Sequence, residues 1–445
     1  MKAFIDAFKV KEIRTRMLFL LICLVIVRIG CQIPAPGFDR DLIAYWQSQM
    51  TESLGFLNML TGGSFSQMSI FALNIGPYIS AEIIMQLLTI IIPRLEELKN
   101  DGESGRKKIA EYSRYTTVLL AVIESVAMSI GFGRSNQVAG GLKFTTIVVM
   151  TISFTAGTCF LMWLGELMTE KGIGSGISMI LLINIVSTLP SDAGRLYTDR
   201  IKGQSVLNAT VAIIIAAVLI VAVLILIILL QDAQRKIPVQ YAKRTQGRKT
   251  LGGQSSFIPL KVNTAGVMPV IFAMAILNLP AIICGFFGVQ AGEASFGRKI
   301  LKLLSSQYWF DFSNGWSSFV YTFGALLYIA MLFFFAYFYT AITFNPNEVA
   351  NNLKKQGGFL PGVRPGTPTA NYLKGVLNYV IVIGAFMLMV IALLPIICSG
   401  VFNARLSFGG TSLIIIAGVI VESMRQVEGM MKERHYKGFL NDSLN

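Results

Sequence analysis

Histidine is almost absent from this 445-residue chain, which has only one, His435. Catalytic triads and HExxH zinc sites both need histidine, so these chemistries are excluded from the apolar segments. No GxxxxGK[ST] motif occurs, so the chain does not hydrolyse a nucleotide by itself. The five cysteines form no CxxC pair and lie in or beside apolar runs, which indicates buried residues rather than disulfides or ligands. We therefore expect no cofactor and no metal site.

Charged residues are also scarce, at 14%, against 54% hydrophobic residues and a mean hydropathy of +0.63. This composition indicates an all-α polytopic membrane protein. The first apolar run has no small-residue cleavage site, so we expect no cleavable signal peptide. No aspartate lies inside a predicted span, and this argues against an intramembrane protease that uses a pair of aspartates.

Ten apolar runs approach the length of about 20 residues that a membrane-spanning helix needs. We predict a transmembrane helix in each. The runs are Met17–Ile33, Phe71–Ile92, Tyr115–Ile130, Phe144–Met168, Gly174–Leu189, Leu207–Leu230, Val262–Val289, Trp316–Phe344, Tyr372–Cys398 and Ser407–Val421.

Lysine and arginine are unevenly distributed between the two sides of these spans. With the N-terminus inside, the inside segments hold 27 of them and the outside loops hold 10. The positive-inside rule then places both termini in the cytoplasm. The same bias explains the formal net charge of +14 without a nucleic-acid partner.

Two inside loops are long and basic: 231–261, with YAKRTQGRK at its centre, and 345–371, with GGFLPGVRPG. Such loops could be topology signals that face anionic lipid, or docking sites for a partner. The proline and glycine residues around Arg364 predict a stiff turn. A lipid-facing basic segment has no need of a rigid turn, so the stiffness favours docking.

The outside segment Leu54–Ser69 is apolar but too short to span the membrane, and Gly62 and Gly63 interrupt it. It could lie as a helix on the outer surface, or it could fold back into the protein. The residues alone leave both open.

Few ionisable residues fall within the spans: Arg28, Glu82, Glu124 and Glu166, with Glu422 near an end. They do not form the pattern of a proton relay. We interpret Arg28 as a structural partner for polar groups in the bundle.

Short, glycine-initiated apolar segments end each half of the chain, at Gly174–Leu189 and Ser407–Val421. This pattern is typical of pseudo-symmetric transporters and channels. A transporter, however, should carry polar groups on its broken helices, and these segments carry Ile and Leu. An enzyme would need a nucleophile and base, and no such pair is apparent.

Eight stretches, in the same order along nearly the whole chain, resemble the SecY family, which forms the channel subunit of protein translocases. They are RIGCQIPAPG, NIGPYISAEIIMQLL, ESGRKKIAEYSRY, LMWLGELMTEKGIGSGIS, YAKRTQGRK, PLKVNTAGVMPVIFA, FNPNEVANNLKKQGGFLPGVRPG and FGGTSL.

The resemblance implies ten transmembrane helices in two pseudo-symmetric five-helix halves around an hourglass pore with a re-entrant plug. The implied parts are a cytoplasmic N-terminal segment 1–16, a first half 17–189, an external hinge loop 190–206, a second half 207–421 with docking loops 231–261 and 345–371, and a cytoplasmic tail 422–445. The plug would be 54–69, including Leu54, Phe56, Leu57, Leu60, Gly62, Gly63 and Phe65. A lateral gate would involve the helices 71–92 and 115–130, with Asn263 and Gln86.

The resemblance also implies a ring of aliphatic side chains that seals the pore. The matching residues are Ile79, Ile83, Leu181, Ile185, Ile271 and Ile415. Such a collar would dewet and block ions while offering no polar group to a sliding chain. Two departures stand out: Leu181 replaces the family's usual isoleucine, and Glu82 with Gln86 shares much of the face of Ile79 and Ile83.

The implied function is a passive protein-conducting channel, not an enzyme, in the bacterial plasma membrane. It would move secretory proteins across that membrane and release transmembrane segments laterally, driven by the SecA ATPase or the translating ribosome. SecE and SecG subunits, signal sequences, nascent polypeptides, membrane lipids and, through the ribosome, ribosomal RNA would be its partners. The docking residues would be Arg364, Arg244, Arg248, Lys249, Lys354 and Lys355.

Overall fold

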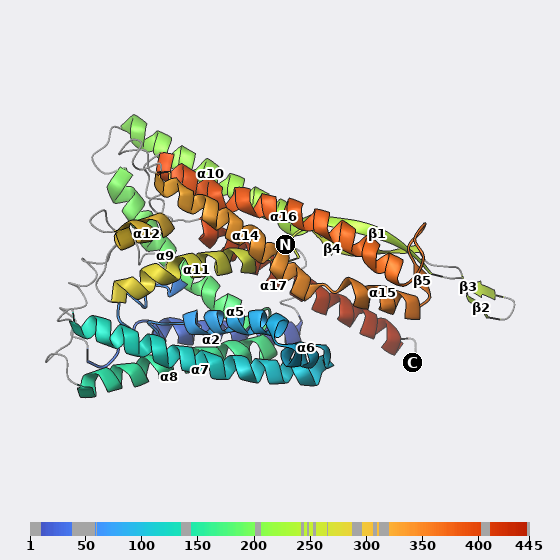
Figure 1. Ribbon diagram of the computed structural model, residues 1–445, viewed down its shortest axis with the longest axis horizontal. Helices are drawn as coiled ribbons and strands as arrows, with labels where there is room; N and C mark the ends of the chain where they lie inside the picture. The colour runs from blue at the N-terminus through green and yellow to red at the C-terminus, as the bar shows by residue number, and fades with distance from the viewer. Residues whose placement is uncertain are drawn as a thin grey trace. The chain divides into compact units, whose positions relative to one another are not determined.

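The computed structural model describes residues 10–37, 58, 60–134, 144–200, 206–241, 244–246, 249–251, 255–264, 266–286, 296–305, 309–310, 320–401 and 410–442. Each of the ten predicted spans overlaps a helix (Figure 1). These helices are α2 (Lys11–Gly30), α5 (Gly76–Ile91), α7 (Gly102–Arg134), α8 (Phe144–Lys171), α9 (Gly176–Arg200), α10 (Val206–Asp232), α11 (Met268–Phe286), α14 (Phe323–Thr343), α16 (Thr367–Val401) and α17 (Gly410–Asp442). The apolar runs thus predicted the positions of the helices, although several helices extend beyond their run.

Helix α9 shows why a run and a helix can differ in length. It continues past Pro190 to Arg200, through residues that we had assigned to a hinge loop. The side-chain hydroxyls of Ser187, Thr188 and Ser191 donate to carbonyl groups of the preceding turn, at 2.7 to 2.9 Å. Helix α9 thus extends beyond the apolar run, although Pro190 removes the helical donor to the Val186 carbonyl.

Four helices among the described residues are long and apolar enough to cross a membrane, and a bent pair would make a fifth. The bent pair is α5 followed by α6 (Pro93–Asn100), at an angle of 105°. The bend falls at Ile92, because a residue before proline is sterically disfavoured in a helix. Gly176–Ser191, Ile220–Asp232 and Met268–Pro280 are shorter apolar helices.

The chain divides into two compact units. Unit 1 comprises residues 1–202, 275–308 and 419–445, and unit 2 comprises 203–274 and 309–418. Both α11 and α17 contribute to each unit, so the division differs from the two sequence halves that we expected.

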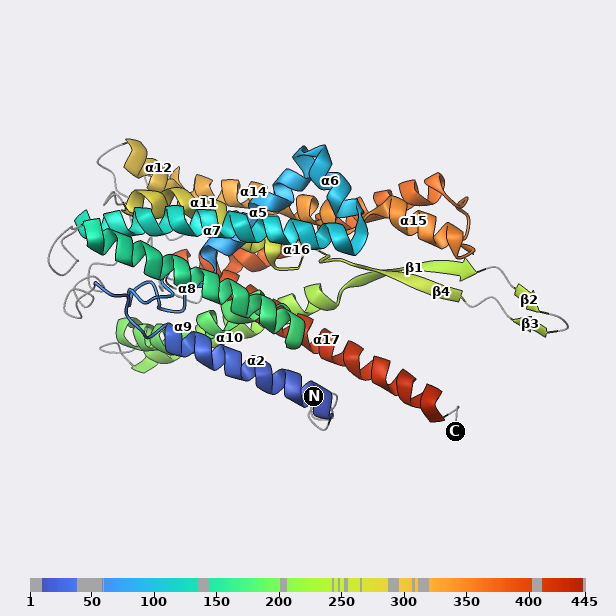
Figure 2. The same cartoon turned by 90° about the horizontal axis from the view of Figure 1, so that it is seen from below.

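In unit 1, α7 packs against α5 and α8, and α2 packs against α8 and α9. Figure 2 shows α7 and α8 side by side along their length. Several side chains of α2 remain exposed and apolar, including Leu18, Ile22 and Val25, as expected for a surface that faces lipid. The short helix α12 (Phe296–Leu304) also belongs to this unit.

In unit 2, α16 packs against α10, α14 and α15 (Pro346–Lys355), while the short 3₁₀ helix η3 (Val320–Thr322) precedes α14. Strands β1 (Gln234–Tyr241) and β4 (Ser255–Lys261) form an antiparallel ribbon in which Ile237 pairs with Ile258. The strand β5 (Gly358–Phe359) pairs with the end of β1. Strands β2 (Arg244–Gln246) and β3 (Lys249–Leu251) pair with each other as a separate two-stranded sheet.

Candidate functional site

The apolar segment that the sequence left between two interpretations is buried in unit 1. Phe65 and Met68 are each 1% exposed, and Ser69 is fully buried. This segment, defined here as the re-entrant segment 60–75, is attached to the residues that follow α2. The Ala35 amide donates to the Met68 carbonyl at 2.9 Å, and the Ile70 amide donates to the Ile33 carbonyl at 3.0 Å. The described part of the segment is therefore folded into the protein and is not a helix on its surface.

Glycines on two helices make room for the far end of this segment. A Cβ atom at Gly30 of α2 would collide with the Phe71 ring, and one at Gly157 of α8 would collide with the Ile70 carbonyl oxygen. Because these clashes involve a packed ring and a backbone atom, larger residues would displace the segment.

Within the segment, backbone groups find local partners instead of helical ones. Asn58 accepts from the Gly63 amide through its carbonyl and from the Ser66 amide through its side chain. The Phe65 amide donates to the Thr61 hydroxyl, and the Ser66 hydroxyl donates to the Gly63 carbonyl. Irregular backbone at membrane depth requires this kind of satisfaction.

Two residues outside the segment contact Gly62, one of the glycines that we had singled out. The Arg28 side chain donates from Nη1 to the Gly62 carbonyl at 3.1 Å, which confirms Arg28 as a partner of a polar group. Gly62 has a φ of +64°, and a Cβ there would lie 2.9 Å from Asn184 Oδ1 on α9. The sequence analysis missed Asn184, although a lone amide within the run ILLINIVS is a visible signal.

Of the other predicted plug residues, Leu60 is half-buried and Gly63 also has a positive φ, of +86°. Leu54, Phe56 and Leu57 lie outside the described residues.

All six predicted ring residues are buried, with exposed fractions between 0% and 9%. In unit 1, α5 carries Ile79 and Ile83 one turn apart, and α9 carries Leu181 and Ile185 one turn apart. In unit 2, α11 carries Ile271 and α17 carries Ile415. The structure thus places each side chain in an apolar interior, while the assembly of the six into one ring remains a prediction.

The carboxylate that we noted near Ile79 and Ile83 has a neighbour on its own helix. Gln86 donates from Nε2 to Glu82 Oε1 at 3.4 Å, and both side chains are half-buried. Asn263, the other predicted gate residue, is 8% exposed in unit 2, and its Oδ1 makes no hydrogen bond within the described residues. Gln86 and Asn263 belong to different units, so their proposed meeting at a gate stays a prediction.

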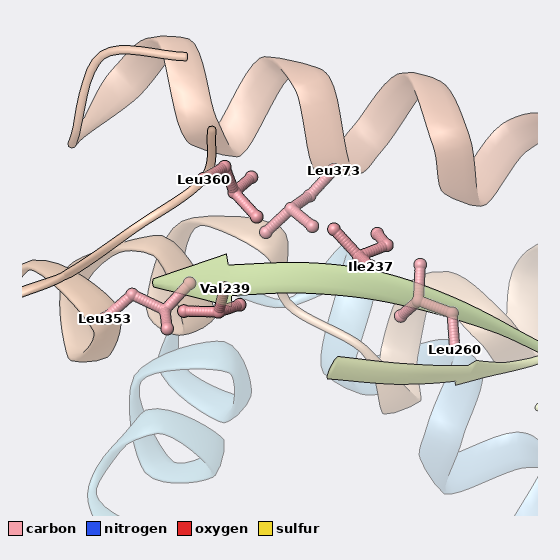
Figure 3. Packing of buried hydrophobic residues seen from close by; sticks show 6 residues of the cluster. All are labelled: Ile237, Val239, Leu260, Leu353, Leu360 and Leu373. Carbon is pink, nitrogen blue, oxygen red and sulfur yellow. The ribbon is translucent and has the colours of Figure 1, made fainter. Parts of the chain in front are cut away.

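The two long loops share one small hydrophobic core, which the sequence analysis did not predict. Figure 3 shows side chains from the β1/β4 ribbon, α15, the turn and α16 that point toward one another. All are buried, at 8% exposure or less. They are Ile237, Val239, Leu260, Leu353, Leu360 and Leu373. We call residues 234–241, 255–261 and 345–373 the loop module.

The glycine- and proline-rich turn of this module uses its glycines at positions of positive φ. Gly357, Gly362 and Gly366 adopt φ values of +71°, +79° and +101°, a region that other residues rarely occupy. The Thr369 hydroxyl donates to the Arg364 carbonyl at 2.8 Å, which ties the turn to the first residues of α16. Arg364 itself is exposed, so the turn presents its charge to solvent.

The remaining predicted docking residues divide by position. Lys354 and Lys355 are exposed in the last turn of α15. Arg244 is the first residue of β2 and Lys249 is the first residue of β3, the two strands that pair with each other. Arg248 lies outside the described residues.

Comparison with known proteins agrees with this arrangement. The SecY family model matches residues 69–424. The protein translocase subunit SecY of Streptomyces lividans is 42% identical over 98% of this chain and 99% of its own length.

Two solved structures share the fold. One is described as showing that the plug domain of SecY stabilises the closed state of the translocation channel, with a TM-score of 0.61, 19% identity and coverage of 94% of this chain and 93% of the other. The second is the idle yeast Ssh1 complex bound to the 80S ribosome, with a TM-score of 0.62, 17% identity and coverage of 95% and 89%. The all-α polytopic membrane fold expected from the sequence is confirmed, and the chain belongs to the SecY family.

Proposed function

We propose that this chain conducts unfolded secretory polypeptides across the bacterial plasma membrane and releases transmembrane segments sideways into lipid. Its family makes it the channel subunit of a translocon, a multi-pass membrane protein without enzymatic activity.

The burial of six aliphatic side chains at the predicted ring positions carries the proposal. None of the six carries a polar group, and each lies on a helix that the sequence analysis had assigned to the membrane. A collar of such side chains repels water and ions but has no fixed hydrogen bond to offer. A polypeptide of any sequence can slide past it, whereas a small-solute transporter needs polar groups that recognise its substrate.

The re-entrant segment would serve as the plug that fills the outer funnel at rest. Its burial and its attachment at residues 33–35 support this role. The backbone bonds to Met68 and Ile70 would hold one end, while the part around Gly62 could leave and return. Displacement of the segment would then accompany the entry of a polypeptide.

The loop module would lie in the cytoplasm and receive the driving force. Arg364 stands at the tip of a stiff turn built on a packed core, so a push against the tip is transmitted to the core and to α16. The SecA ATPase would bind here through Arg364, Lys354 and Lys355. The translating ribosome would contact the basic tip at residues 244–249 through RNA phosphates. SecE, SecG and membrane lipids would complete the complex.

Reconstitution separates this function from solute transport. The chain would be incorporated with SecE and SecG into vesicles, and a radiolabelled secretory precursor would be added with SecA and ATP. We expect precursor to become protected from protease only when both SecA and ATP are present, with a precursor lacking its signal sequence as the control. Ion-gradient-dependent uptake of a small solute, without precursor protection, would instead support the transporter.

A further inference from the structure

Gly62 lies between two polar side chains that reach it from different helices of unit 1. Arg28 of α2 is half-buried and donates to the Gly62 carbonyl at 3.1 Å. Asn184 of α9 is fully buried, and its Cα lies 2.9 Å from where a Gly62 Cβ would be. The positive φ at Gly62 and this close approach both require glycine.

The two side chains differ in how well they are satisfied. The bond from Arg28 joins a cationic donor to a backbone carbonyl, and such charge-assisted bonds are stronger than neutral ones, more so away from water. The Asn184 amide makes no hydrogen bond through either Oδ1 or Nδ2 within the described residues. A buried amide in this condition has lost its hydration without a replacement.

We propose that Arg28 and Asn184 act in opposite directions on the seating of the re-entrant segment, an inference that rests on the proposed function. Arg28 is a positioning residue that holds the seated segment through the Gly62 carbonyl. Asn184 disfavours the seated state, because water reaches its amide only when the segment leaves. The balance of the two sets how readily the channel opens.

This balance explains why a polar residue occupies the interior of α9. A segment held by Arg28 without opposition would resist displacement by a signal sequence. An amide that is desolvated only in the closed state lowers that resistance without loosening the contacts at residues 33–35. The unfavourable desolvation of the Asn184 amide therefore acts only while the segment is seated.

The test measures passive leak of a small anion through vesicles that contain the full translocase, with no precursor present. Arg28→Met removes the donor and is expected to raise the leak several-fold, while Arg28→Lys can still donate and should retain part of the seal. Asn184→Ala removes the amide without added volume, and we expect leak below the wild-type level. The double variant should leak less than Arg28→Met alone.

Arg114→Met is the matched control, because Arg114 of α7 pairs with Glu166 of α8 at 2.7 Å. The amount of folded protein in the membrane is measured for every variant. The proposal is overturned if Arg28→Met is as tight as the wild type, if Arg114→Met leaks as much as Arg28→Met, or if Asn184→Ala leaks more than the wild type. Precursor protection by the wild type is scored separately. A wild type that protects no precursor contradicts the proposed function. The leak measurements, in contrast, test the opposing roles proposed for Arg28 and Asn184.

Discussion

The re-entrant segment and the loop module are both irregular, glycine-rich parts of a helical protein, yet they are stabilised in different ways. The segment lies among helices, and its backbone groups are matched by nearby backbone, hydroxyl and amide groups. The module packs six aliphatic side chains into a core of its own and exposes its charged turn to solvent. Irregular backbone surrounded by helices and lipid needs internal partners, whereas water can satisfy an exposed turn.

Glycine illustrates the difference. At Gly62 the backbone is close to two side chains, so the residue is required by contact as well as by conformation. At Gly357, Gly362 and Gly366 an added Cβ would meet no atom within 4 Å, so conformation alone requires glycine. The re-entrant segment should therefore be sensitive to substitutions that change side-chain size. The loop module should be sensitive to substitutions that change the charge of its turn or remove its core side chains.

The largest effect that separates the regions is expected from Arg364→Glu. Reversal of this exposed charge should lower SecA-driven precursor export by roughly tenfold or more, since a lost charged contact costs at least about 1.4 kcal/mol of binding. The seal should be unaffected. Export into inverted vesicles provides the measurement.

Lys374→Glu supplies the control for that experiment, because Lys374 is exposed on α16 beyond the turn. Normal export by Arg364→Glu would show that the docking role is wrong. Equal losses from both variants would assign the effect to general charge instead of to the turn.

Ile415→Asn should weaken the seal of the channel. Ile415 is 1% exposed, and an amide there would hydrate the proposed collar. We expect export of a precursor with a defective signal sequence to rise several-fold. Ile420→Asn is the control on the same helix, because Ile420 is 45% exposed. No rise over this control would remove Ile415 from the ring.

Leu373→Ala tests whether the module depends on its own core. Leu373 is fully buried, so truncation should cost about 2–5 kcal/mol of local stability. Amide hydrogen exchange should accelerate in β1 and β4 while that of the re-entrant segment stays unchanged. Tyr372→Ala changes the exposed neighbouring residue and should leave exchange in the ribbon near the wild-type rate. Faster exchange in both regions would contradict their independence.

The smallest effect is expected at the surface of the ribbon. Lys236 Nζ lies 4.9 Å from the centroid of the exposed Phe257 ring, a cation–π contact worth about 0.5–1 kcal/mol. Lys236→Gln should therefore raise the exchange rate in the ribbon only slightly. Lys261→Gln, at the end of the ribbon where Lys261 pairs with Gln234, is the comparison and should have no effect.

The sequence predicted what depends on local composition. Each of the ten apolar runs overlaps a helix, because long apolar runs favour helices in lipid. The glycine and proline pattern of residues 357–366 predicted the turn for a similar reason, since φ preferences act on single residues.

The features that sequence reasoning missed depend on distant contacts. Ile237 and Val239 alternate toward one face of β1, but Pro238 between them weakens the strand pattern. Their core partners Leu353 and Leu373 lie far along the chain, so no local window could reveal the module. Asn184 likewise becomes meaningful only when the fold brings Gly62 beside it. From the sequence, the re-entrant segment could lie on the outer surface or fold back into the protein, and only the structure distinguishes the two.

The central claim is that a polypeptide passes through the aliphatic collar. We would place a photoreactive amino acid at Ile271, stall a secretory precursor with SecA and ATP in inverted vesicles, and look for a covalent adduct. A lipid-facing position, Leu326 on α14, is the control. An adduct at Ile271 that requires both SecA and ATP is the predicted result. Absence of that adduct, with efficient labelling of lipid at Leu326, would mean that Ile271 is part of the packed core and that the polypeptide takes another path.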